Sequence, residues 1–183
     1  MRERIQAGLL CGLIALTLVV TAGAGKGATA FHFMGDFSNV RHTPEHAYGY
    51  RLQLWREGER LVGLFSDASG QAADTPVGLI EDVHFNPASG SLTFHAKLSV
   101  ASVYAGKGKQ EPTHDLFTFK GTVRDNEVRG ILTHADRSRP GMRANSKGLQ
   151  LHKTNTGAMV EASSYDEWKR AVDDILKVRG PKW

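Results

Sequence analysis

Four side chains that can titrate or form hydrogen bonds stand in phase with the apolar residues of the predicted strands. Each of Tyr50, Glu81, Asp115 and His134 lies two residues from a Leu, Val or Phe of the same strand. Residues two apart in a strand face the same side of a sheet, so these four share the apolar face. Phe117 shares this face. Polar groups above an apolar floor are the common construction of a small-molecule pocket, so these five residues form the candidate ligand-binding site. The alternative is a solvated rim, or an internal pair of Glu81 with His134.

The sequence offers no pattern typical of catalysis, of a metal site or of a bound cofactor. His42 and His46 are four residues apart, a spacing that suits a helix, but Pro44 stands between them. The Gly-Lys-Gly-Lys stretch at 106–109 lacks the spacing of a phosphate-binding loop. We therefore predict no catalytic residue, no metal ligand and no cofactor. An acid–base enzyme built on the candidate site is the third-ranked alternative.

Period-two alternation from Phe31 to Lys153 predicts a mainly β domain. Strands are expected over residues 31–37, 48–56, 60–66, 76–86, 91–100, 114–124, 128–135 and 148–153. Tight turns at 57–58, 87–90 and 125–126 join three pairs of strands, and the apolar pattern gives each hairpin a register. The expected cross-strand partners are Leu54 with Leu61, Leu52 with Gly63, Phe85 with Leu92, Val123 with Val128 and Phe119 with Leu132.

Long and short connections alternate along this chain. The long ones cover roughly residues 38–47, 67–75, 101–113 and 136–147. In an up-and-down meander every second connection lies at the same end, so the long loops gather at one end, the mouth, together with the candidate site. The predicted fold is an eight-stranded antiparallel up-and-down β-barrel over residues 31–153, or an open sandwich if the sheet does not close.

The C-terminal part of the chain predicts one α-helix packed on the outside of the barrel. Residues 154–163 form a polar linker, and Ser164 with Glu167 makes a capping box at the start of a helix over 164–180. An apolar stripe on this helix consists of Trp168, Val172, Ile175 and Leu176. A single stripe needs an apolar partner surface, which the residues expected to point outward supply: Val62, Leu64, Ile80 and Ile131.

Residues 1–30 have the three parts of a secretory signal peptide: a basic start, an apolar middle and a small-residue exit. Cleavage is expected after Ala24 or Ala30, and an uncleaved anchor is the alternative. We thus expect a periplasmic or secreted protein that contacts a membrane only through this segment, if it stays uncleaved. Removal of 1–30 takes away three basic residues and one acidic residue, which lowers the formal net charge from +4 to +2. So small a charge argues against a nucleic-acid partner.

Eight meandering strands followed by one helix resemble the layout of the lipocalin and wider calycin barrels. Those families usually carry Gly-x-Trp on the first strand, and the matching stretch here is Gly35-Asp36-Phe37. The chain is also similar to uncharacterised exported bacterial proteins. The resemblance implies an exported cup for a small, largely apolar ligand.

Two main hypotheses about function follow from these patterns. In the first, the protein binds a small, largely apolar ligand, and the barrel interior is open. In the second, it is an envelope interaction or structural protein that contacts an envelope protein or a lipid through its long loops. The second hypothesis predicts a filled interior.

Overall fold

The computed structural model describes residues 29–70, 75–104, 108–139 and 141–183. The predicted signal segment lies almost wholly outside these residues. The elements are β1 (His32–Ser38), β2 (Arg41–His42), β3 (Ala47–Glu57), β4 (Arg60–Gly70), β5 (Val77–Asn86), β6 (Ser91–Leu98), β7 (Ser102–Tyr104), β8 (Gln110–Pro112), β9 (Asp115–Arg124), β10 (Glu127–Asp136), β11 (Asn145–Lys153) and α1 (Tyr165–Arg179). In the part of the chain described, no helix is long and apolar enough to span a bilayer.

The main sheet closes on itself as an eight-stranded antiparallel barrel, which confirms the predicted fold class. Strand β1 closes the ring because it pairs with β3 on one side and with β11 on the other. The pairing with β11 is short and involves Phe37 opposite Lys153 and Ser38 opposite His152. The two-residue strand β2 lies beside the end of β3, and β7 and β8 form a separate hairpin.

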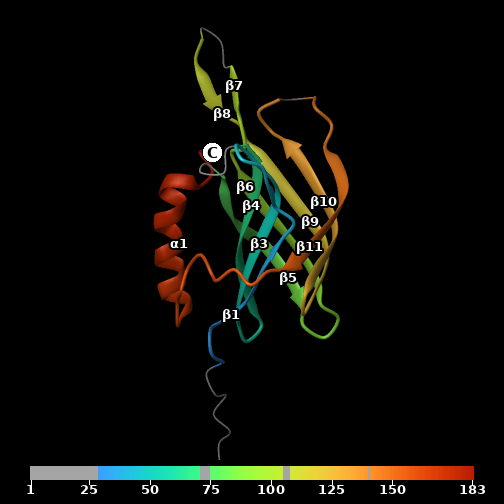
Figure 1. Cartoon of the computed structure of the whole chain (residues 1–183), viewed down its shortest axis with the longest axis vertical. Coiled ribbons are helices and arrows are strands. Elements are labelled where there is room, and N and C mark those ends of the chain that lie inside the picture. The colour runs from blue at the N-terminus through green and yellow to red at the C-terminus, as the bar shows by residue number, and fades with distance from the viewer. Residues whose placement is uncertain (1–28, 71–74, 105–107, 140) are drawn as a thin grey trace, which may run out of the picture.

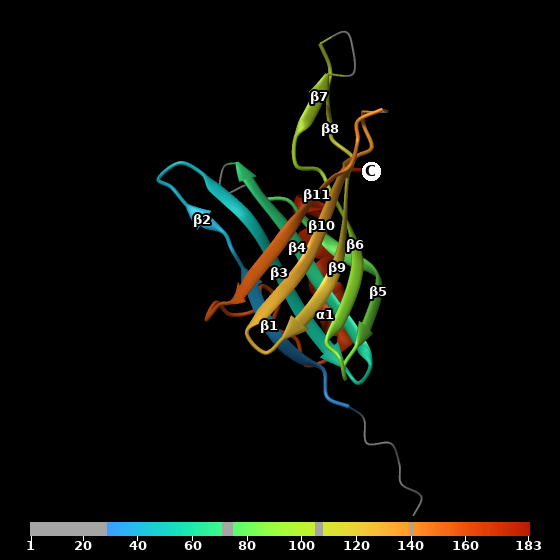
Figure 2. The same cartoon turned by 90° about the vertical axis from the view of Figure 1, so that its right-hand side faces the viewer.

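The long connections lie together at one end of the barrel, as the alternation of loop lengths predicts. Figure 1 shows the β7–β8 hairpin and the β10–β11 loop at the top of the molecule, and the tight turns at the bottom. The second view, turned by a right angle, places the β2–β3 connection at the upper end as well (Figure 2). This upper end is the mouth.

Two hairpins have the expected register and one does not. Val123 faces Val128, and Phe85 faces Leu92. In the β3–β4 hairpin, however, Leu54 faces Gly63 instead of Leu61, a shift of two residues. The turn residues are Gly58 and Glu59 because Gly58 has a φ of 60°, which suits the first central position of a two-residue turn. A shift of two keeps every side chain on its predicted face.

Strand β5 contains a bulge that reverses its predicted faces. The pairing with β6 shifts register between Glu81 and His84, and Asp82 has a φ of 49°. One additional residue in a strand breaks the alternation of its side chains. The residues before the bulge then face the opposite side of the sheet from the side that the residues after it would predict. Ile80 therefore packs in the interior core, although it was expected outside, and Glu81 points outward, although it was expected inside.

Aromatic side chains fill the middle of the barrel. Phe65 on β4 lies 5.4 Å from Phe117 on β9, between ring centroids, and 5.9 Å from Phe94 on β6. Phe94 in turn stacks on Phe119 at 5.2 Å. These phenyl rings come from strands on different sides of the barrel and touch one another. The barrel interior at this level is therefore filled by packed side chains.

A second apolar cluster lies between the barrel wall and α1. The helix begins after Ser164, whose Oγ accepts a hydrogen bond from the Glu167 N–H at 3.3 Å, as the capping box predicts. Trp168 and Val172 are buried against the outer face of the barrel, where Trp55 lies 5.6 Å from Trp168. Figure 1 shows the helix on the outside of the barrel, which confirms its predicted position.

Candidate ligand-binding site

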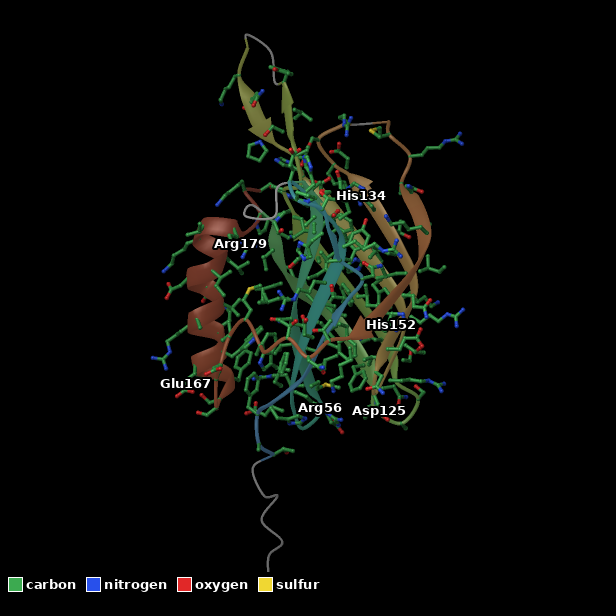
Figure 3. The ribbon with its side chains drawn as sticks, viewed as in Figure 1. Arg56, Asp125, His134, His152, Glu167 and Arg179 are labelled. Atoms are coloured by element: carbon green, nitrogen blue, oxygen red, sulfur yellow. The ribbon has the colours of Figure 1, made fainter. Side chains whose placement is uncertain are left out.

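Four of the five predicted site residues meet on the inner face of the barrel near the mouth. The His134 ring on β10 stacks on Phe117 of β9, with centroids 4.5 Å apart and an interplanar angle of 8°. Tyr50 on β3 contacts the edge of Phe117 at 6.2 Å. Asp115 lies two residues before Phe117 and bonds to His134. Figure 3 shows His134 toward the mouth end of the barrel.

The fifth predicted residue, Glu81, lies outside the barrel because of the bulge in β5. Its carboxylate is 3.5 Å from Nζ of Lys97 on the neighbouring strand. Both side chains are well exposed, so water screens this pair and it contributes little to stability. Glu81 therefore takes no part in the interior site, and the expected internal pair with His134 is wrong: His134 pairs with Asp115.

Asp115 is a buried, fully bonded carboxylate with 1% of its surface exposed. It accepts hydrogen bonds from His134 Nε2 at 2.7 Å and from the Val100 N–H at 3.0 Å, and a further one from Thr113 Oγ1. Burial raises the pKa of Asp115, but the three hydrogen bonds outweigh burial and hold that pKa below its usual value. Because an ionised carboxylate can only accept, the His134 nitrogen that faces Asp115, Nε2, is the donor of this bond.

A second acidic side chain at the mouth, Asp67, was missed by the sequence analysis. It lies opposite Tyr50 in the β3–β4 register and is 8% exposed. Burial raises its pKa to about 6, while the nearby positive charge of Lys147 opposes the rise. The predicted strand ended at residue 66, whereas β4 continues to Gly70. Asp67 lies two residues after the inward-facing Phe65, and this spacing is the signal in the sequence that places Asp67 on the inner face.

Lys147 also belongs to the inner face, although the sequence placed it in a loop. Strand β11 begins at Asn145, and Leu149 and Leu151, in phase with Lys147, belong to the core. The ammonium group of Lys147 lies 4.5 Å from the centroid of the Tyr50 ring. A cation over an aromatic face is favourable by roughly 0.5–1 kcal/mol where water still reaches it. We call the six residues of this inner face the mouth cluster: Tyr50, Asp67, Asp115, Phe117, His134 and Lys147.

The barrel wall is open beside the mouth cluster, between β3 and β11. Strand β1 ends at Ser38, and beyond it the two-residue β2 pairs with β3 only, so in the described part of the chain no strand pairing joins this end of β3 to β11. Asn39 holds the lower end of the opening, since its Oδ1 accepts from the Tyr50 N–H at 2.8 Å and its Nδ2 donates to the Gln150 carbonyl at 3.1 Å. Figure 2 shows β2 and β3 diverging from β11 toward the mouth.

A cavity of about 340 Å³ occupies this opening, and we call it the seam cavity. Tyr48, Tyr50, Arg41 and Lys147 line it, together with backbone of the glycines on both strands. No carboxylate is among the lining residues that the structure describes. The cavity thus combines two aromatic rings with two cationic groups, which suits a planar ligand that carries a negative charge.

The candidate metal ligands of the sequence do not form a metal site. Among the residues that the structure describes, no group of three His, Cys, Asp or Glu side chains could hold a metal ion. His42 lies on β2, and the His46 ring stacks on Tyr48 at 5.9 Å.

The fold and the mouth cluster define a small closed antiparallel β-barrel with a polar site at its loop-bearing end. This architecture is compatible with a lipocalin-like fold. A scan against models of protein families, a search of curated proteins and a search of solved structures each find no match for this chain.

Proposed function

We propose that this protein is an exported, lipocalin-like binding protein that takes a small, largely apolar ligand with an anionic group at the mouth of its barrel. The seam cavity carries the proposal, because it brings two tyrosine rings and two cations together beside a cluster of buried ionisable groups. Ionisable groups with shifted pKa values gather preferentially at functional sites.

The packed core restricts the ligand to the upper part of the barrel. Phe65 and Phe117 form the floor, and Tyr50 stacks on Phe65 with centroids 5.6 Å apart. A ligand therefore binds above these rings and not deep inside, as it would in an open cup. The half-exposed Tyr48 ring can take its planar part, and Lys147, held over the Tyr50 ring, is the partner for its negative group.

A fluorescent probe with this chemistry tests the proposal. Anilinonaphthalene sulfonate has a planar apolar body and one negative charge, and we expect it to bind with one probe per chain. Lys147→Met and Tyr50→Leu should each weaken binding by about tenfold or more, equivalent to ~1.4 kcal/mol. Lys120→Met is the matched control, because Lys120 is an exposed lysine on the outer face of β9. Absence of binding, or equal weakening by the control, would overturn the proposal.

Export is the second half of the proposal and has its own test. The basic start, apolar middle and small-residue exit of residues 1–30 support it. Protein recovered from the periplasm or the medium should begin at Gly25 or Phe31. Recovery of the intact N-terminus from the cytoplasm alone would contradict export.

A second candidate function is supported by the packed interior and by the exposed β7–β8 hairpin. Tyr104 at its tip is 75% exposed, and the hairpin extends beyond the end of the barrel (Figure 1). In this alternative the hairpin contacts an envelope partner, for which anionic lipid is the simplest to test. The alternative predicts co-sedimentation with phosphatidylglycerol vesicles that Tyr104→Ser abolishes, in a protein that does not bind the fluorescent probe.

A further inference from the structure

A larger cavity lies on the opposite side of the barrel wall from the mouth cluster. It measures about 480 Å³ and is bounded by the outer faces of β1, β3 and β4, by the linker after β11 and by the C-terminal end of α1. Its strand residues alternate with core residues: Ser38 follows the buried Phe37, and Ser66 follows the buried Phe65. We call it the outer cavity. It shares no described lining residue with the seam cavity.

A buried carboxylate anchors one wall of the outer cavity. Asp36, the middle residue of the Gly35-Asp36-Phe37 stretch, is only 1% exposed. It accepts from Arg51 Nε at 2.5 Å and from Thr154 Oγ1, while its backbone carbonyl accepts from the Thr154 N–H at 2.8 Å. These bonds hold the linker on the barrel and fix the Arg51 guanidinium through its Nε edge. The two terminal nitrogens of Arg51 make no hydrogen bond with any described residue.

A second guanidinium group reaches the same cavity from the helix. Arg179 is the last residue of α1, and its Nε and Nη2 donate to the Thr75 carbonyl at 3.1 and 2.7 Å. Figure 3 shows Arg179 at the end of α1 nearer the mouth, beside the barrel. Its partner is a neutral carbonyl, so its positive charge is not neutralised by that bond. Among the lining residues that the structure describes, the outer cavity therefore holds two guanidinium charges and one carboxylate charge, a net charge of +1 before any contribution from His42.

Hydroxyl groups make up much of the remaining polar lining. Ser38, Ser66, Thr154 and Thr156 contribute side-chain hydroxyls. Ser38 and Thr154 already donate to the Tyr50 carbonyl and to Asp36, so towards a ligand they can only accept. The apolar part is small and consists of short or flexible side chains such as Ala68 and Met159. No Phe, Tyr or Trp ring lines this cavity within the described residues, in contrast to the seam cavity.

We propose that the outer cavity binds a small hydroxylated carboxylate of the sugar-acid class. The guanidinium groups of Arg51 and Arg179 bind the carboxylate, since the planar fork of a guanidinium matches a carboxylate in charge and geometry. The serine and threonine hydroxyls bind the hydroxyl groups of the ligand. The carboxylate can come from a free sugar acid or from the terminal unit of an acidic polysaccharide. This inference does not depend on the mouth site.

Calorimetric titration of the full chain with glucuronate and with glucose tests this site. Glucuronate should bind at least about tenfold more tightly than glucose, because only glucuronate carries the carboxylate. Arg179→Met should weaken glucuronate binding by about tenfold, as expected for loss of a charged hydrogen-bond donor, whereas Arg170→Met, an exposed arginine of the same helix, should leave it unchanged. Equal binding of the two sugars, no binding of either, or equal effects of the two substitutions would overturn the proposal.

Three further measurements keep the test decisive. Ser66→Ala removes a lining hydroxyl without removing a charge, and it should weaken glucuronate binding about fivefold even if Arg179→Met destabilises the helix end. An oligouronate that binds more tightly than glucuronate would identify polysaccharide as the source, and equal affinity would identify the free acid. Lys147→Met should not change glucuronate binding, so failure at the outer cavity and failure at the mouth are distinguishable.

Discussion

Replacement of Asp67 by asparagine should stabilise the protein above pH 6 and leave its stability almost unchanged below pH 4. Burial raises the pKa of Asp67 from 3.8 to about 6 in the folded chain. Between these values the native state binds more protons than the unfolded state, so the wild-type free energy of unfolding falls as pH rises. Its contribution is fully present below pH 3.8 and is lost as pH rises through 6.

The size of this effect follows from the shift of roughly two pKa units. Each unit corresponds to about 1.4 kcal/mol, which gives an advantage of ~3 kcal/mol for the Asp67→Asn variant above pH 6. Asparagine retains the shape of the side chain and does not titrate. Lys147 opposes the pKa rise, so Lys147→Met should widen the difference between the aspartate and asparagine forms.

Urea unfolding at a series of pH values from about 4 to about 8 measures the difference directly. The buried indoles of Trp55 and Trp168 should report unfolding by fluorescence. Asp115→Asn is the control with the opposite sign: the pKa of Asp115 lies below its usual value of 3.8, so that variant should be less stable than wild type by a constant amount across this range, and the loss should diminish only below pH 3.8. A stability difference between the Asp67→Asn variant and the wild-type protein that stays constant across this pH range would refute the reasoning.

Three further substitutions test the packing by urea unfolding at neutral pH. Gly121→Ala should cost about 1–3 kcal/mol, because its new methyl group would collide with the Arg129 carbonyl and lie 2.6 Å from Phe119 Cζ; an unchanged midpoint would contradict this close approach. Trp168→Phe should cost no more than about 1 kcal/mol, because the buried Trp168 Nε1 has no partner among the described residues; a loss above ~3 kcal/mol would indicate a bond that this account lacks. Ser164→Ala should cost about 1 kcal/mol through loss of the helix cap, and no loss would mean that the cap contributes nothing.

The alternation of apolar residues was sufficient to predict most of the fold. A buried face every second residue leaves little freedom in register, so the Val123–Val128 and Phe85–Leu92 pairs are as expected. The β3–β4 register was two residues off because Gly58 was assigned to the second turn position and occupies the first. That error moved partners along the strand but did not change which face they occupy.

The candidate site was less predictable than the fold, for two physical reasons. The bulge at Asp82 adds one residue to β5 without any compositional signal, and it reverses the face of Glu81. Asp67 and Lys147 lie at strand ends near the mouth, where polar residues resemble those of loops. Strand length there is set by pairing with the neighbouring strand, which single-sequence patterns do not contain. The residues missed, Asp67 and Lys147, are therefore the polar residues at the ends of their strands.

Native mass spectrometry of the protein purified from its own export compartment shows whether the mouth of the barrel holds a ligand. We expect a co-purifying small molecule on the wild-type chain that is absent from the Tyr50→Leu variant and retained by the Lys120→Met control. A bare wild-type mass, or a bound molecule that Tyr50→Leu does not remove, would contradict a ligand site at the mouth.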